Sequence, residues 1–175
     1  LKKDYNTLML YIGADHRGIQ LKDAIKEFLV VEGREVEDAG ANEFNPEDDY
    51  VDFARVVAEK VMKEPFLNKG ILMCGSGHGM DIAANKFKGI RAVLGFNRYL
   101  AVQSREHGNA NVLVLAADYI KEKEAKDIVF DWLDSTFTNE ERHQRRLKKI
   151  EEIEDKNFGA DRRDSNFGVK IDMPR

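Results

Sequence analysis

Residues 69–87, KGILMCGSGHGMDIAANKF, decide both the expected fold and the candidate site. The run KGILMCG is apolar without polar alternation, which is typical of a strand buried on both faces of a parallel sheet. The run MDIAANKF favours a short helix. Between them, three glycines alternate with a serine and a histidine, and the only cysteine, Cys74, comes directly before this loop. The stretch therefore predicts a buried strand that turns sharply into a helix beside a thiol.

The same alternation of strand and helix continues on both sides of this stretch. Apolar runs of the strand type occupy residues 8–14, 34–40, 90–96 and 111–117, and runs with helical periodicity occupy residues 19–33, 52–64, 98–107 and 123–137. Strands separated by helices indicate a parallel sheet covered on both faces. We expect a three-layer α/β/α, doubly wound (Rossmann-like) sheet of five parallel strands with right-handed crossovers.

The chain changes character after this α/β core, which we assign to residues 1–137. Residues 138–157 are highly charged, with basic residues concentrated in RHQRRLKK, and apolar residues recur only at Leu147, Ile150 and Ile153. A helix with so narrow an apolar stripe is not stable by itself, so we expect it to remain part of the same domain and to dock on a partner subunit. Residues 158–175 predict an extended polar tail.

Composition narrows the class of protein. The chain has 175 residues, 42% of them hydrophobic and 34% charged, and a formal net charge of −4, which gives no general attraction to nucleic acid or to an anionic membrane. One cysteine excludes an internal disulfide framework and fits a reducing compartment. No apolar run approaches the ~20 residues of a membrane span, and no signal peptide is recognisable. We expect a cytoplasmic protein.

Candidate functional residues follow the predicted strands. In open α/β sheets ligands bind at the carboxyl ends of the strands, and we expect Asp15, His16, the Cys74 loop and His107 to meet there. Each has a common structural explanation on its own: a small buried thiol, a sharp turn, a helix cap. Together, a thiol beside backbone N–H donors that favour the thiolate suits removal of a proton next to a carbonyl. The same donors suit stabilisation of an enediolate.

Four motifs occur in a specific order: IGADHRGIQLK, MCGSGHGMDIAANKFKGIRAV, SREHGNANVLVL and ERHQRRLKKIEEIE. Together they resemble the ribose-5-phosphate isomerase B family, which includes galactose-6-phosphate isomerases, from about Leu8 to Asp155. The resemblance implies aldose–ketose isomerisation of a sugar phosphate through a cis-enediolate, with ribose 5-phosphate and ribulose 5-phosphate as the expected pair. It also implies no metal or other cofactor, and a homodimer, or a dimer of dimers, with shared active sites.

Residue roles follow from the resemblance, position by position. Cys74 is the expected base, with Ser76 beside the reacting oxygens, His107 opening the furanose ring and Asp15 on the ring hydroxyls. The expected substrate and oxyanion contacts are Gly75, Gly77, His78, Gly79, Tyr50 and Gly108. The expected phosphate ligands are His16, Arg142 and Arg146, the two arginines reaching across from the partner. Arg142 and Arg146 are four residues apart and so share one face of a helix.

Two departures from the family pattern concern the substrate. Gly108 replaces a usual asparagine, and Asp118 replaces a usual arginine that helps to bind phosphate, a loss that Arg98 or Arg17 would have to replace. Two alternatives therefore stay open: an isomerase of another phosphosugar, such as a hexose, tetrose or galactose-6-phosphate type, and a non-catalytic sugar-phosphate-binding relative. Nucleic-acid binding rests only on RHQRRLKK and is disfavoured by the acidic chain. The glycine loop follows the third strand and lacks the spaced acid of a dinucleotide site.

Overall fold

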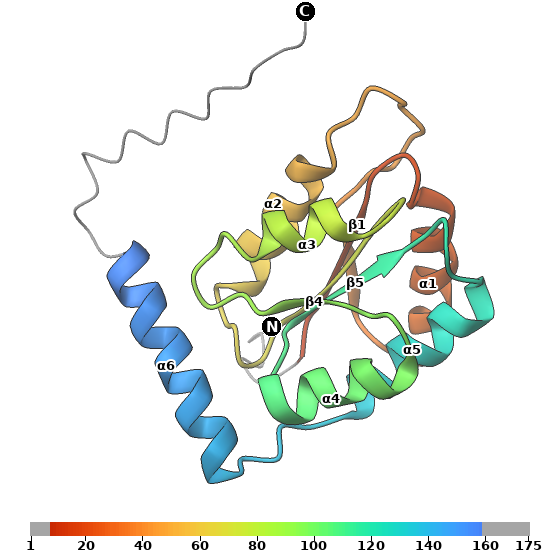
Figure 1. Cartoon of the computed structure of the whole chain (residues 1–175). Coiled ribbons are helices and arrows are strands. Elements are labelled where there is room, and N and C mark those ends of the chain that lie inside the picture. The colour runs from red at the N-terminus through yellow and green to blue at the C-terminus, as the bar shows by residue number, and fades with distance from the viewer. Residues whose placement is uncertain (1–7, 159–175) are drawn as a thin grey trace, which may run out of the picture.

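A sheet of five parallel strands runs through the centre of the protein (Figure 1). The computed structural model describes residues 8–158. The strands are β1 (Leu10–Ala14), β2 (Val36–Asp38), β3 (Lys69–Cys74), β4 (Ala92–Leu94) and β5 (Val112–Ala116). Their order is β2-β1-β3-β5-β4, and all four strand pairs are parallel. The predicted five-stranded parallel sheet is confirmed, with β3 at its centre.

Helices cover both faces of this sheet. They are α1 (Ile19–Val31), α2 (Tyr50–Val61), α3 (His78–Ala84), α4 (Arg98–Gly108), α5 (Glu122–Asp134) and α6 (Glu141–Phe158). Figure 1 shows α2 and α3 on one face and α1, α4 and α5 on the other. The chain reverses its direction across the sheet after β2 and again after β4. Right-handed crossovers place helices on opposite faces when that direction reverses, so the strand order explains the three layers.

Strand β3 contributes to both cores because it is buried along its whole length. Ile71 and Met73 pack in the cluster beneath α1, α4 and α5, whereas Leu72 and Cys74 pack in the cluster beneath α2 and α3. Alternate side chains of a strand point to opposite faces. The Cys74 side chain therefore points toward the α2 and α3 layer from the last position of the strand.

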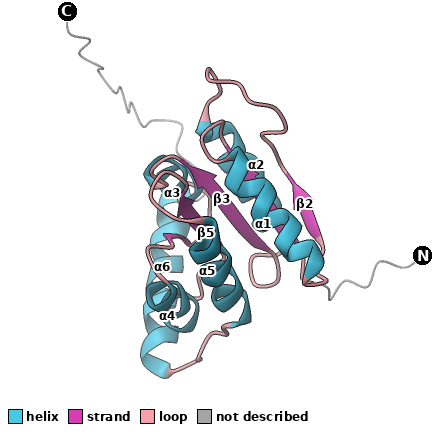
Figure 2. Cartoon of the chain, turned by 90° about the vertical axis from the view of Figure 1, so that its right-hand side faces the viewer, coloured by secondary structure: helices cyan, strands magenta, loops and turns pink. Residues whose placement is uncertain are grey.

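The last helix, α6, stands apart from the two helical layers. Figure 2 shows it on the side of the molecule opposite to the edge strand β2. Its first turn is attached through His143, which is buried and pairs with the Thr138 hydroxyl at 3.1 Å. The Thr138 hydroxyl in turn donates to the Glu106 carbonyl of α4. The predicted helix is confirmed, but its docking on a second subunit stays a prediction.

The tail predicted for residues 158–175 lies outside the described residues, except that Phe158 is the last residue of α6. Among the helices of residues 8–158, none combines the length and apolar character needed to cross a bilayer.

Candidate active site

A pocket of about 340 Å³ lies at the carboxyl ends of β1, β3 and β5, which we call the carboxyl edge. The chain passes from β1 into α1 on one face of the sheet and from β3 into α3 on the other face, and such a switch between neighbouring strands is where open α/β sheets bind ligands. Nine residues line the pocket: Asp15, Arg17, Tyr50, Cys74, Gly75, Ser76, Gly79, Asp118 and Tyr119. The pocket thus brings together most of the residues that the sequence predicted for the reacting centre.

Cys74 ends β3 with its side chain almost completely buried. The turn that follows needs glycine at Gly77, where φ is +78° and a Cβ would lie 2.4 Å from a methyl group of Leu94. This turn brings the Gly77 N–H to 3.2 Å from the Cys74 Sγ. The predicted donors are therefore present, and the amides of Met80 and Ser76 also interact with the thiol.

The N–H donors favour the thiolate, as expected, but they do not by themselves determine the pKa of Cys74 in a single chain. Burial raises the pKa of the Cys74 thiol above its ordinary value, and this effect outweighs the lowering by the backbone N–H groups. The nearby Asp15 carboxylate raises the pKa further. In one chain alone, burial thus favours the thiol of Cys74, and positive charge next to the pocket would favour the thiolate.

The first turn of α3 forms one wall of the pocket. Backbone N–H groups in the first turn of a helix have no partner within the helix, and Gly79 in this turn lines the pocket. The Tyr50 ring covers Gly79 so closely that a Cβ there would lie 2.5 Å from the ring. Ser76 is exposed in the same wall, whereas Gly77 and His78 do not line the pocket. A small residue at Gly79 therefore allows the pocket to be closed by Tyr50.

Asp15 closes the turn after β1 and also lines the pocket. Its Oδ1 accepts hydrogen bonds from the backbone N–H groups of Arg17 and Gly18, each at 3.0 Å. Burial raises the pKa of Asp15, while those two hydrogen bonds oppose the rise. The expected structural role of Asp15 as the cap of the first helix is wrong, because the N-cap of α1 is Gly18 and has no side-chain cap. The hydrogen bonds of Asp15 close the turn before the helix and fix the carboxylate at the pocket.

His16 is not among the residues that line the pocket. Its Nδ1 lies 2.6 Å from Asp48 Oδ1, and its ring meets Phe44 edge-on, with centroids 5.8 Å apart. These contacts hold the imidazole against the loop that precedes α2. The role of His16 as a phosphate ligand stays a prediction.

His107 does not lie at the carboxyl edge, and this part of the expectation is wrong. It lies near the end of α4, and a crossover helix ends beside the amino end of the strand that follows it. Consistently, Gly70 at the start of β3 donates to the Asn111 carbonyl, just after α4. The His107 ring instead contacts the His143 ring of α6, with centroids 4.4 Å apart. His107 and Cys74 are thus at opposite ends of the sheet within one chain.

Gly108 and the two arginines expected from a partner lie on the same side of the molecule as His107. Gly108 ends α4, and Arg142 and Arg146 are exposed on the first turns of α6. The Arg142 Nε donates to Glu140 at 2.8 Å, a surface ion pair. We call this region, formed by the end of α4 and the start of α6, the amino edge. It carries an imidazole and two guanidinium groups, and none of them lines the Cys74 pocket.

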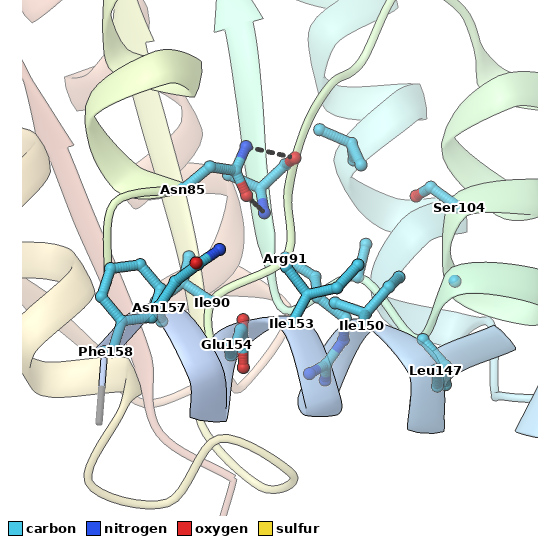
Figure 3. A pocket seen from close by; sticks show the side chains of 14 residues that line it. Asn85, Ile90, Arg91, Ser104, Leu147, Ile150, Ile153, Glu154, Asn157 and Phe158 are labelled. Carbon is cyan, nitrogen blue, oxygen red and sulfur yellow. Dashed lines mark hydrogen bonds between the residues drawn. The ribbon is translucent and has the colours of Figure 1, made fainter. Parts of the chain in front are cut away.

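A groove of about 500 Å³ separates α6 from the body of the protein. Figure 3 shows Leu147, Ile150 and Ile153 of α6 on one wall and Ile90 on the other. The side chains of Ile150 and Ile153 are 43% and 58% exposed, which is high for isoleucine. Two contacts anchor the far end of α6: Gly89 N–H to Glu154 at 3.0 Å, and Lys88 to Asp155 at 2.6 Å. The helix is therefore held at both ends over an apolar gap.

Tyr119 of the pocket was not assigned a role from the sequence. Arg17 was named only as one of two possible replacements for the missing arginine, and the other, Arg98, does not line the pocket. Arg17 follows β1 by three residues and Tyr119 follows β5 by three residues. The rule that ligands bind at the carboxyl ends of parallel strands would have indicated both. Within residues 8–158, no group of three or more His, Cys, Asp or Glu side chains is placed to hold a metal ion.

Comparison with known proteins relates this site to one family. A sequence model described as Ribose/Galactose Isomerase matches residues 10–150. A probable ribose-5-phosphate isomerase B of Mycoplasma genitalium is 44% identical over 141 residues, which cover 81% of this chain and 92% of the relative.

Solved structures agree with the sequence match. The crystal structure of ribose-5-phosphate isomerase B from Mycoplasma genitalium with bound ribulose-5-phosphate superposes with a TM-score of 0.83, at 42% identity, over 86% of this chain and 98% of that chain. The ribose-5-phosphate isomerase B of Clostridium thermocellum superposes with a TM-score of 0.80, at 45% identity, over 85% of this chain and 99% of that chain.

Proposed function

The chain belongs to the ribose/galactose isomerase family, and we propose that it interconverts ribose 5-phosphate and ribulose 5-phosphate. The observation that carries this proposal is the position of Cys74. Its thiol ends the central strand and lines a pocket with Ser76 and the first turn of α3. A similar protein has been solved with ribulose-5-phosphate bound. We also propose the cytoplasm as the site of action, as the single cysteine indicates.

The pocket residues suit proton transfer between neighbouring carbons. As a thiolate, Cys74 takes the proton from C2 of the open-chain aldose, and the C2–H electrons form the C1–C2 double bond of a cis-enediolate. The hydroxyl proton moves from O2 to O1, and Cys74 returns its proton to C1, which gives the ketose. Ser76 and the Gly79 N–H hold the enediolate oxygens, while Asp15 accepts hydrogen bonds from sugar hydroxyls. No step consumes or releases an electron.

The charge of the pocket supports completion of the site by a second copy of the chain. Its lining contains two carboxylates and one guanidinium, a poor environment for a sugar phosphate and for a thiolate. The cations that are missing here stand exposed at the amino edge, on Arg142 and Arg146. In the proposed symmetric homodimer, the amino edge of one protomer adjoins the carboxyl edge of the other. His107 then reaches the furanose ring, and the arginines bind the phosphate.

The apolar groove under α6 supports the same assembly. A second copy that fills this groove would bury Ile150 and Ile153 and would fix the helix that carries both arginines. Such burial contributes about 1.5–3 kcal/mol for each fully buried isoleucine. One homodimer interface would thus account for both the exposed apolar groove and the separation of the functional residues. A dimer of dimers is compatible with this interface.

An isomerisation assay tests the proposed function. Ribose 5-phosphate, hexose 6-phosphates and a tetrose phosphate are incubated with the full chain in the presence of EDTA, and the ketose formed is measured. We expect turnover of ribose 5-phosphate that EDTA does not reduce. Turnover of only another phosphosugar would replace the substrate but keep the reaction. Absence of turnover with every sugar, despite binding, would indicate a non-catalytic relative.

A further inference from the structure

Arg17 and Asp118 form an ion pair at the mouth of the Cys74 pocket. The Arg17 Nη2 donates to Asp118 Oδ2, and both residues line the pocket. The two residues are 101 positions apart in the chain. They come together because Arg17 follows β1 and Asp118 follows β5, and these strands flank β3 in the sheet. The ion pair therefore spans the end of the strand that carries Cys74.

The residue under this ion pair is Gly75, the neighbour of Cys74. A Cβ at Gly75 would lie 2.6 Å from the Arg17 Nε and 2.7 Å from the Asp118 Oδ2, so any side chain there would displace the pair. A backbone hydrogen bond fixes the position of Asp118, because its N–H donates to the Gly75 carbonyl at 3.0 Å. On the other side, the Arg17 N–H donates to Asp15. Both partners are thus tied to the loops that form the pocket.

Arg17 is the only cationic residue among the nine that line the pocket. Its side chain is 56% exposed, and Asp118 is the only hydrogen-bond partner of its guanidinium among the described residues. A guanidinium has five N–H donors, so most of them remain free to bind an anion. The phosphate is the group of a sugar phosphate that carries full charge before the reaction starts. A guanidinium is well suited to bind it through two hydrogen bonds.

We propose that Arg17 binds the phosphate of the substrate and that Asp118 is a positioning residue, which holds the guanidinium over Gly75. This inference rests on the proposed function, because it assigns a further substrate contact to the same pocket. The chain's own phosphate ligand then lies at the carboxyl edge, separate from the arginines proposed to come from the second copy. Asp118 orients Arg17 but also brings a negative charge near the phosphate.

Two variants test the proposal, Arg17→Met and the double variant Arg17→Met/Asp118→Asn. Arg17→Met removes a charged hydrogen bond and leaves the Asp118 carboxylate unpaired next to the phosphate. We expect KM for ribose 5-phosphate to rise about ten- to a hundredfold, with kcat within about threefold of the wild type. The double variant removes the unpaired carboxylate, so its KM falls again by several-fold below that of Arg17→Met.

The matched control is Arg98→Met. Arg98 forms the same type of ion pair, with Asp131 at 2.5 and 2.9 Å, on the outer surface of α4 and α5 and away from the pocket. Its KM should equal that of the wild type. If Arg17→Met also leaves KM unchanged, or lowers kcat alone, Arg17 does not bind phosphate in the ground state and the proposal is wrong.

A binding measurement separates this inference from the proposed function. Inorganic phosphate should raise the melting temperature of the wild type and of Arg98→Met, and raise that of Arg17→Met clearly less. If the wild type does not isomerise any phosphosugar, the proposed function fails, and the phosphate result decides the role of Arg17 by itself. Equal stabilisation of all three proteins by phosphate, or none in any of them, overturns the assignment.

Discussion

The two ends of the sheet differ in whether the candidate functional residues of one chain lie together around a pocket. At the carboxyl edge, Cys74, Asp15 and the Arg17–Asp118 pair are tied to one another through backbone hydrogen bonds around a pocket. At the amino edge, His107, Arg142 and Arg146 carry an imidazole and two guanidinium groups, and among the described residues none of these three lines the Cys74 pocket. The difference teaches that one chain does not bring these two groups of residues together, which is the basis of the proposed shared site.

The largest expected effect comes from removing the thiol at the carboxyl edge. Cys74→Ala should lower kcat by about 10²–10⁴, because proton transfer by a positioned base is worth that much. Binding of inorganic phosphate should be retained, since Cys74 does not contact the phosphate in the proposed arrangement. Kinetics on ribose 5-phosphate and a thermal shift with phosphate are the measurements. A variant with near-normal kcat would show that Cys74 is not the base.

A smaller effect is expected from the apolar groove at the amino edge. Ile153→Asp places a carboxylate in the groove. Because the proposed interface is symmetric, the substitution removes one isoleucine from each of the two protomers. Ile153 is 58% exposed in one chain, so only about half of the 1.5–3 kcal/mol for full burial is lost from each side, and the dissociation constant of the dimer should rise at least about tenfold. Analytical ultracentrifugation measures the assembly, and activity at low protein concentration should fall with it.

The control for this variant is Lys149→Asp, also on α6. Lys149 is exposed and does not line the groove, and the change in charge there is larger. It should leave the assembly and the activity as they are. An Ile153→Asp protein that still forms the dimer would show that the groove is not part of the interface.

The smallest expected effect concerns the contact between His143 and His107. Burial lowers the pKa of His143, and electrostatic interaction with His107, Arg142 and Arg146 lowers it further. The Glu140 carboxylate has the opposite effect and raises this pKa, but by less. The unfolded chain, with a histidine pKa near 6.5, therefore binds the proton more tightly. The stability that this contact contributes is full above about pH 6.5 and is lost as the pH falls toward the folded-state pKa.

Melting temperatures between pH 7.5 and pH 5 check this expectation. The wild type should lose more stability over this range than His143→Gln, which cannot take up the proton. A variant of the exposed His78, His78→Gln, should follow the wild type. Parallel curves for the wild type and His143→Gln would mean that protonation of His143 does not weaken the attachment of α6.

Much of the carboxyl edge could be predicted from the sequence, because its signals are local. The apolar run before Cys74 and the glycines after it dictate a buried strand and a sharp turn, whatever the rest of the chain does. The pKa of Cys74 could not be predicted, because it depends on a competition between burial and N–H donors. The Arg17–Asp118 pair could not be predicted as a contact either, since it exists only through the strand order β1-β3-β5.

The position of His107 was predicted wrongly for a physical reason. Its place just before a strand suggested the same edge as Cys74, but a helix that leads into a parallel strand ends at the amino end of that strand. The resemblance to a known family assigns His107 to the active site. Because His107 lies far from Cys74 within one chain, this role requires a second chain, and no pattern within one sequence shows where a second chain lies. The fold was therefore easier to predict than the part of the proposed site that would come from a second chain.

Mixing two inactive variants tests the shared site most directly. Cys74→Ala retains the cations of the amino edge, and Arg142→Ala/Arg146→Ala retains the thiol, so a hybrid dimer has one intact composite site. After subunit exchange at equal concentrations, half of the dimers are hybrids, and the mixture should regain about one quarter of the wild-type activity. If subunit exchange is demonstrated and the activity of the mixture stays at the sum of the two separate variants, the active site is not shared between chains.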